Sequence, residues 1–307
     1  MESLQFLIIL IFSPLIQGVI KKLKALMQGR VGPGIFQTYY DLIRLLKKDM
    51  VISPVTSWIF KAAPYVVFVS TIAASMIIPV ITTQYPLVTI SDVIALIYIF
   101  GLARFFMALA GLDAGTAFGG EGSSREMTVA ILVEPMMMLS IFTAAISAGS
   151  TNMARIAEAQ SIFYSPSHVL AFSAFIVAVI AETGRIPVDN PDTHLELTMI
   201  HEGMLLEYSG RYLALMEWAH YMKQMLLFTI AVDIFFPLGI AGTDATGIAP
   251  LMASFGVYMI KMFFMAFLMA ITESTRAKMR FFQLPSLLGG AFVLSVLSLL
   301  MYIMMGR

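Results

Sequence analysis

Eight runs of about 20 mainly apolar residues constrain the fold of this 307-residue chain more than any other feature. They cover residues 4–20, 58–82, 92–112, 127–148, 168–184, 212–237, 250–271 and 285–305. A helix of that length crosses the hydrocarbon core of a bilayer, where helices and closed barrels are the structures that satisfy every backbone polar group. The sequence therefore predicts an all-α polytopic membrane protein of about eight transmembrane helices. We expect residues 1–307 to form one integral membrane domain.

Composition excludes several classes of protein. Hydrophobic residues make up 59% of the chain and charged residues only 12%, which argues against a soluble enzyme and against disorder. The 19 basic residues balance the 19 acidic ones, so we expect no nucleic-acid partner. There is no cysteine, so this chain has no thiolates to ligate an iron–sulfur cluster or a nickel centre. We expect no cofactor and no metal in this chain.

The charges are distributed unequally between the loops. The odd-numbered loops carry almost all of the loop Lys and Arg, whereas the even-numbered loops carry only Arg155. Because cytoplasmic loops hold the excess of basic residues, we expect the odd loops to face the cytoplasm and both termini to lie outside the cytoplasmic membrane. Most of the loop carboxylates lie in the same odd loops. Such a lopsided polar face is typical of a protein that docks a partner there.

The first cytoplasmic loop contains an amphipathic segment. Gly32-Pro33-Gly34 marks a turn, and residues 36–48 place apolar and polar side chains on different faces of a helix. Such a helix lies at the membrane interface. It is either a surface helix anchored by its lysines or a docking platform for a peripheral arm, in which case Asp41, Arg44 and Lys48 are the docking residues.

The second cytoplasmic segment leads into a buried acid. Its glycines complete neither a dinucleotide-binding nor a Walker pattern, so we exclude nucleotide binding. Glu134 follows Arg125 by nine residues, about 14 Å along a helix, which places its carboxyl well inside the fourth span. An ionisable group at that depth is a functional candidate by default.

The third cytoplasmic segment, residues 182–211, holds six carboxylates, two histidines and two arginines. A zinc-protease pattern begins at His201-Glu202 but has Leu205 where the second His is required. A solvated acidic loop is the plainer reading, but the interleaved apolar residues favour half-buried carboxylates that pair with Arg or share protons. The sixth span continues with a polar stripe at helical spacing. The candidate relay residues are Glu134, Glu182, Asp189, Asp192, Glu196, Glu202, Glu207, Glu217, His220 and Lys223, with Arg125 and Arg185 as charge partners.

A family resemblance rests on these motifs. The run ETGRIPVDNPD, with the later LEL and EYSG, resembles the acidic loop of the respiratory complex I membrane subunit that holds the quinone tunnel. The likeness extends to the first loop and to the spacing of Arg125 and Glu134. Residue by residue, the loop resemblance covers Glu182, Arg185, Pro187, Asp189, Asp192 (Glu in the family), Glu196, Glu207 and Tyr208.

Departures from complex I point to another branch. The stretch between Gly34 and Gln37 is shorter, His194 replaces an acid, and a few residues are inserted around 198–201. These features resemble the membrane-anchor subunit of energy-converting group 4 nickel–iron hydrogenases and formate hydrogenlyases. That likeness implies partners: hydrogenase large and small subunits, an iron–sulfur subunit and antiporter-like membrane subunits, which would hold the Ni–Fe centre and the clusters. It implies a subunit that is not itself catalytic and that links electron transfer to H⁺ or Na⁺ translocation.

Two other functions stay open at this point. One is a subunit of a quinone-reducing or sulfur-reducing complex I-like oxidoreductase. The other is a stand-alone secondary transporter. Many transporters contain inverted repeats, and the sequence shows none, which argues against this function.

Overall fold

The computed structural model describes residues 4–84, 87–159, 165–189, 199–241 and 248–305. Within these ranges the chain is helical, and its extended pairing is limited to two isolated bridges. The helices are α1 (Leu4–Met27), α2 (Gln37–Lys47), α3 (Trp58–Ile77), α4 (Val93–Asp113), α5 (Ala117–Ala148), α6 (Met153–Glu158), α7 (Pro166–Glu182), α8 (His201–Leu205), α9 (Gly210–Phe235), α10 (Ile248–Thr275) and α11 (Leu284–Met305), with short 3₁₀ turns η1 (Val88–Ile90) and η4 (Phe281–Gln283).

Eight of these helices correspond to the eight predicted spans. Among the described residues, six are both long and apolar enough to cross a membrane: α1, α3, α4, α5, α10 and α11. The other two are α7, an apolar helix of 17 residues, and α9, whose 26 residues include four charged side chains. The prediction of an all-α multi-pass membrane protein is therefore confirmed.

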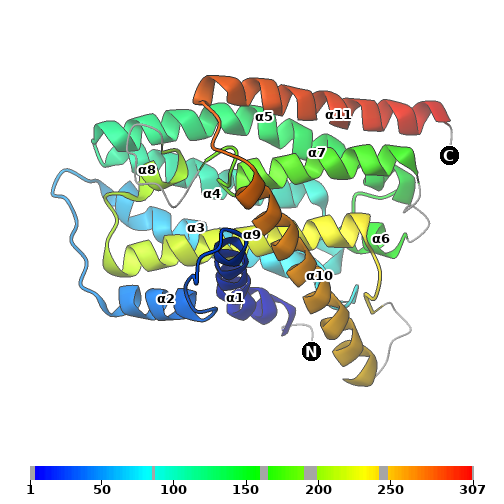
Figure 1. Ribbon diagram of the computed structural model, residues 1–307, viewed down its shortest axis with the longest axis horizontal. Helices are drawn as coiled ribbons and strands as arrows, with labels where there is room; N and C mark the ends of the chain where they lie inside the picture. The colour runs from blue at the N-terminus through cyan, green and yellow to red at the C-terminus, as the bar shows by residue number, and fades with distance from the viewer. Residues whose placement is uncertain (1–3, 85–86, 160–164, 190–198, 242–247, 306–307) are drawn as a thin grey trace.

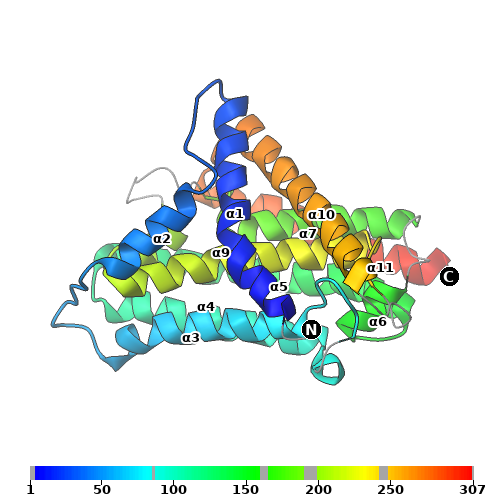
Figure 2. The same cartoon turned by 90° about the horizontal axis from the view of Figure 1, so that it is seen from below.

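The helices form two sets by direction. Figure 1 shows α3, α4, α5, α7, α9 and α11 running alongside one another, while α10 crosses them diagonally. Turned by 90°, Figure 2 shows that α1 also crosses the set at a steep angle and lies next to α10. The amphipathic helix α2, predicted over 36–48, forms over Gln37–Lys47 and packs on α9.

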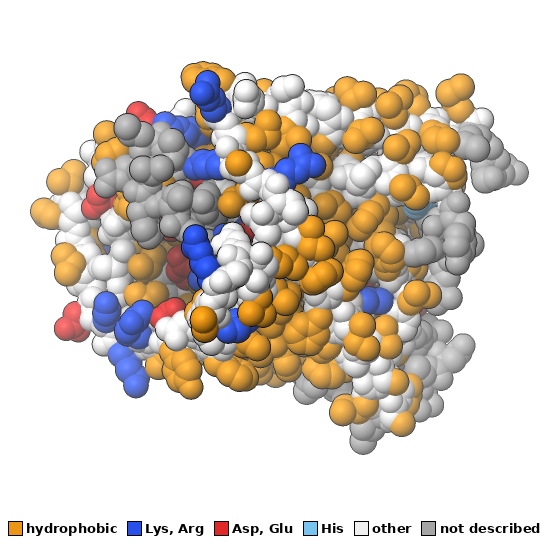
Figure 3. All heavy atoms as spheres, viewed as in Figure 1, with side chains coloured by type: hydrophobic (Ala, Val, Ile, Leu, Met, Phe, Trp, Pro, Cys, Tyr) orange, Lys and Arg blue, Asp and Glu red, His pale blue; other side chains and the backbone are white. Residues whose placement is uncertain are grey.

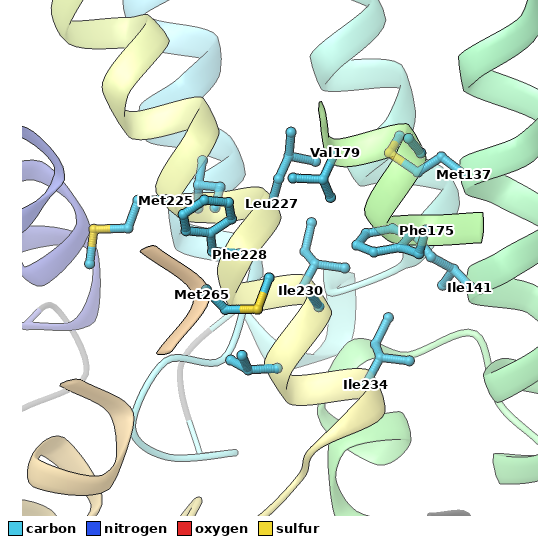
Figure 4. Packing of buried hydrophobic residues seen from close by; sticks show 14 of the residues in the cluster. Met137, Ile141, Phe175, Val179, Met225, Leu227, Phe228, Ile230, Ile234 and Met265 are labelled. Atoms are coloured by element: carbon cyan, nitrogen blue, oxygen red, sulfur yellow. The ribbon is translucent and has the colours of Figure 1, made fainter. Parts of the chain in front are cut away.

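Helix α9 lies at the centre of the packing. Its second half, including Leu227, Phe228 and Ile230, is almost fully buried and meets Phe175 of α7 and Met265 of α10 (Figure 4). In a membrane such contacts stabilise the fold through close van der Waals packing rather than through exclusion of water. The buried stripe fixes α9 between its neighbours, and the polar residues of its first half are positioned accordingly.

Odd and even loops gather at opposite ends of the molecule. At the even-loop end, Thr82 pairs with Ala241, and Gln5 accepts a hydrogen bond from the Val80 amide at 2.6 Å. At the odd-loop end, the Tyr208 hydroxyl donates to the Phe60 carbonyl at 2.8 Å, and the two rings stack. In Figure 3 charged side chains gather over the half that contains α2, and hydrophobic ones dominate the other half.

The acidic loop is only partly helical where it is described. Residues 190–198 lie outside the described ranges; Met199 and Ile200 are not helical, and α8 begins at His201. This segment lies directly on α5, because a Cβ added to Gly122 would come within 2.9 Å of the Ile200 carbonyl oxygen. A glycine at this point of α5 therefore lets the acidic loop approach the membrane helices.

Candidate functional site

Arg104 is the centre of a buried cluster of charges. It lies 11 residues into α4 and is 5% exposed. Its guanidinium donates hydrogen bonds to Glu134 of α5 and to Glu182 at the end of α7, and its Nε lies 3.7 Å from Glu126. Lys223 of α9 adds a second cation, 2.7 Å from the Glu182 carboxylate. Side chains from four helices thus form one ionic cluster.

The spacing on α5 explains how one guanidinium reaches two of these acids. Glu126 and Glu134 are eight residues apart, about 12 Å along the helix, and a forked guanidinium placed between them presents donors in both directions. The Glu134 side chain is 39% exposed, whereas that of Glu182 is 3% exposed. The cluster therefore extends from the buried end of α7 to the outer surface of this chain.

Arg185 organises a second cluster, beside the first. It is 2% exposed and pairs with Glu273 of α10 at 2.9 Å. It also donates to the side-chain carbonyls of Gln17 of α1 and Gln224 of α9. Lys24 of α1 lies 2.9 Å from the same Glu273 carboxylate. These contacts tie the acidic loop to the two steeply inclined helices.

A polar cavity of about 180 Å³ opens beside Arg185. Its lining contains three cations, three carboxylates and an imidazole, and it has room and polar partners for several water molecules. His220 also lies against His201, with ring centroids 4.4 Å apart. The lining residues are Gln17, Ile20, Lys21, Lys24, Arg185, Glu202, Glu217, His220, Tyr221 and Glu273.

Two side chains on α8, outside the membrane-spanning helices, have pKa values shifted from their ordinary ranges. Burial raises the pKa of Glu202 to about 8, and the nearby carboxylates of Glu217 and Asp189 act in the same direction. Burial lowers the pKa of His201 to about 4, with Lys223 adding to the effect. Near neutral pH the cavity edge therefore holds a protonated carboxyl next to an uncharged imidazole. The carboxyl can release its proton when a change in its surroundings lowers its pKa.

Polar stripe residues of α9 join the two clusters. Glu217 and His220 line the cavity, and Lys223, one turn further along, pairs with Glu182 in the Arg104 cluster. Residues three apart on a helix lie on the same face. The structure thus brings together, in one contiguous group, the predicted Glu134, Glu182, Arg185, Glu202, Glu217, His220 and Lys223.

The remaining candidates do not make the contacts that join this group. Asp189 is buried next to this group, bound to Lys278 at 2.7 Å and to the Ile200 amide at 3.1 Å. Glu207 is exposed, apart from the clusters, and Arg125 contacts Glu121 and the Met199 carbonyl rather than Glu134. Asp192 and Glu196 lie outside the described residues. On α2, Asp41 and Arg44 form an exposed ion pair at 2.7 Å, and Lys48 is exposed just beyond the helix.

Sequence reasoning missed the centre of the site. Arg104, Glu126, Glu273 and Gln17 were not among the predicted site residues. A signal existed for Arg104, because an arginine 11 residues into an apolar span is expensive unless it faces acids within the protein. Within the described residues, no three His, Asp or Glu side chains lie close enough together to hold a metal ion.

Comparisons with known proteins fit this geometry. A family model described as NADH dehydrogenase matches residues 1–305. Hydrogenase-4 component C of Escherichia coli is 37% identical over 96% of this chain and 92% of its own length, and formate hydrogenlyase subunit 4 of the same organism is 33% identical over 94% of each. A subunit of the NADH-quinone oxidoreductase of Syntrophotalea carbinolica is 30% identical over 86% of this chain and 82% of its own. A chain of the membrane-bound sulfane sulfur reductase, an archaeal respiratory complex, has the same fold, with a TM-score of 0.80 at 19% identity over 98% of this chain and 99% of its own.

Proposed function

This chain belongs to the NADH dehydrogenase family of membrane subunits, together with hydrogenase-4 component C and formate hydrogenlyase subunit 4, and we propose that it anchors and couples a multi-subunit membrane-bound hydrogenase. In this role it links electron transfer in a peripheral [NiFe] arm to translocation of H⁺ or Na⁺. The relatives of higher identity are hydrogenase subunits, which favours this function over quinone reduction. One observation supports the coupling role: the ionisable stripe of α9 lies between the polar cavity and the ion-pair cluster that contains Glu134.

The charge balance of the Arg104 cluster supports a protonation role. Three carboxylates, Glu126, Glu134 and Glu182, face two cations, Arg104 and Lys223. If all five are ionised, one negative charge is left in a membrane helix bundle, where an uncompensated charge is costly. Carboxylates in this situation share a proton. The cluster therefore contains one more carboxylate than it has cations, and a proton taken up there would neutralise the excess charge.

The cavity is suited to deliver that proton. Three cations, Lys21, Lys24 and Arg185, line the cavity together with Glu217, Glu273 and the protonated Glu202, so loss of the Glu202 proton would leave the lining with as many negative as positive charges. In this coupling mechanism, a change of charge in the peripheral arm alters the protonation of Glu202 and of the neighbouring imidazoles. That change passes along the α9 stripe to Lys223 and then to Glu182 and Glu134. The neighbouring antiporter-like subunits would receive it at the partly exposed Glu134.

The odd-loop end is the proposed docking face. It holds the exposed charges of α2, with Asp41, Arg44 and Lys48 as contacts for the hydrogenase subunits. The excess of Lys and Arg in the odd loops supports a cytoplasmic location for this end, with both termini outside. The iron–sulfur clusters and the Ni–Fe centre would then lie in the partner subunits on this side of the membrane.

The coupling role is tested by removing the charge of Glu134 while leaving its shape. The complex with Glu134→Gln, in liposomes, should evolve hydrogen but move fewer ions per hydrogen than wild type. Glu121→Gln is the matched control, because Glu121 lies on the same helix and its side chain is 53% exposed beside Arg125. If both variants assemble and keep the full ion-to-hydrogen ratio, Glu134 has no part in coupling.

A further inference from the structure

Asp233 is a buried acid far from the clusters described above. It lies 23 residues after the first residue of α9 and two before the last, about 35 Å along the helix from the odd-loop end. It is 1% exposed, and within the described part of the chain neither carboxylate oxygen has a hydrogen-bond partner. An acid so deeply buried and yet unpartnered is unusual, because buried polar groups in proteins are nearly always satisfied.

The surroundings of Asp233 are polar on one side. Thr229, one turn earlier on α9, shares a hydrogen bond of 2.8 Å with the hydroxyl of Tyr258 on α10. Lys261 follows Tyr258 by one turn and therefore lies on the same side of α10. Among the described residues, Tyr258 and Lys261 are the titratable groups that act on Asp233. Four residues of two helices thus face one another at this position.

Lys261 does not neutralise Asp233 by direct contact. No ion pair within 4 Å joins it to Asp233 in the described residues, and no hydrogen bond reaches the acid from it. An ionised carboxylate without a bound cation is strongly disfavoured in a buried membrane site. Something small must therefore neutralise Asp233 while Lys261 stays at a distance.

The charge of the site and its oxygen atoms limit which ion can neutralise Asp233. The site supplies one negative charge, and a positive ammonium stands nearby, so a divalent cation would be left with a large excess of charge. Carboxylate and hydroxyl oxygens suit a hard cation, and a carboxyl binds a proton directly. The occupant is therefore monovalent and small.

We propose that Asp233 forms a binding site for a small monovalent cation, H⁺ or Na⁺, between α9 and α10, with Thr229 and Tyr258 as neighbouring oxygens and Lys261 as a competing internal cation. The site is separate from the Arg104 cluster, because the apolar residues Met225 to Phe228 of α9 are buried between them. The inference does not depend on the proposed coupling role. Approach of the ammonium to Asp233 would expel the cation, and its withdrawal would allow rebinding.

Infrared difference spectroscopy of the complete complex in liposomes tests the proposal by observing the carboxyl itself. The wild-type spectrum should contain a signal of an occupied Asp233 that Asp233→Asn lacks. Loss of a carboxylic-acid band on raising the pH, without any effect of Na⁺, identifies H⁺. A change of the Asp233 carboxylate band on replacing K⁺ by Na⁺ at constant pH identifies Na⁺. The control is Glu158→Gln, an exposed acid at the same end, whose spectrum should keep the Asp233 signal.

Lys261→Met separates a binding site from a structural ion pair. If Lys261 competes with the cation, its removal should tighten cation binding by about tenfold or more, because a nearby like charge is lost. The proposal is overturned if wild type shows no Asp233 acid band at any pH, its carboxylate ignores Na⁺, and an acid band first appears in Lys261→Met. That pattern means Asp233 is permanently ionised and held by the ammonium.

Discussion

Replacing Arg104 with glutamine should destabilise the protein far more than loss of a surface arginine. The guanidinium pairs with Glu126 and Glu134 and is one of two cations that pair with Glu182. Removing one member of a buried ion pair costs about 3–5 kcal/mol. We assign most of that loss to Glu182 and Glu126, because the Glu134 side chain is 39% exposed and its pair is screened by solvent.

The assay is thermal unfolding of the purified complex. At about 2 °C per kcal/mol for a chain of this size, Arg104→Gln should lower the Tm by about 6 °C or more. Arg155→Gln is the control, since Arg155 is exposed at the even-loop end and should change stability by about 0.5 kcal/mol or less. The double variant Arg104→Gln, Glu182→Gln should recover part of the loss, because it leaves fewer unpaired charges. If Arg104→Gln unfolds at the same temperature as Arg155→Gln, the cluster is not an ionic unit and the reasoning fails.

Three further predictions concern the cavity, the α8–α9 junction and the docking face. Glu202 has a pKa of about 8 in the folded protein and about 4.3 when unfolded, so the folded state keeps a proton that the unfolded chain releases. Its contribution makes the stability of the folded state fall as the pH rises between these values. The Tm of a Glu202→Gln variant should therefore fall less steeply than that of wild type across this pH range. An identical fall in Tm would refute the raised pKa of Glu202. Gly210 has φ +54°, and an added Cβ would lie 2.7 Å from the Asp49 carbonyl oxygen, so Gly210→Ala should lower the stability of the folded state by about 1–2 kcal/mol. The control Gly101→Ala, in open space within α4, should be neutral or stabilising. Equal melting temperatures of the two variants would contradict this prediction. The double variant Arg44→Glu, Lys48→Glu should retain less of the hydrogenase arm when the membranes are washed with salt, because like charges would then face the partner. The control Arg155→Glu should retain the arm as wild type does. Full retention by the double variant would show that α2 is not part of the interface.

The spans and their order were predictable from sequence because they depend on local composition. Hydropathy located all eight helices, and α2 followed from its amphipathic pattern. The ends were less accurate: α5 begins at Ala117 rather than at residue 127, because its first turns are glycine-rich and charged yet pack between α4 and α8. Local composition does not report such tertiary support.

The site was predictable only as a set of residues and not as a set of contacts. Arg185 was expected to hold a carboxylate, but its partner Glu273 is 88 residues away, and nothing local indicates that pairing. Glu134 lies in the middle of α5, and its partner is Arg104 on the preceding helix, whereas Arg125 on its own helix pairs with Glu121. Long-range pairs of this kind follow from how the helices cross, which the pattern of one span does not determine.

Lys223 offers the most direct test of the coupling role, because it lies between the cavity and the Arg104 cluster. Its ammonium is 2.7 Å from the Glu182 carboxylate. The measurement is the number of ions moved per hydrogen evolved, in liposomes containing the complex with Lys223→Met or with the charge-retaining Lys223→Arg. We expect the methionine variant to evolve hydrogen with a clearly reduced ratio and the arginine variant to keep most of it. An unchanged ratio in a fully assembled methionine complex would contradict the coupling role and leave this chain as an anchor alone.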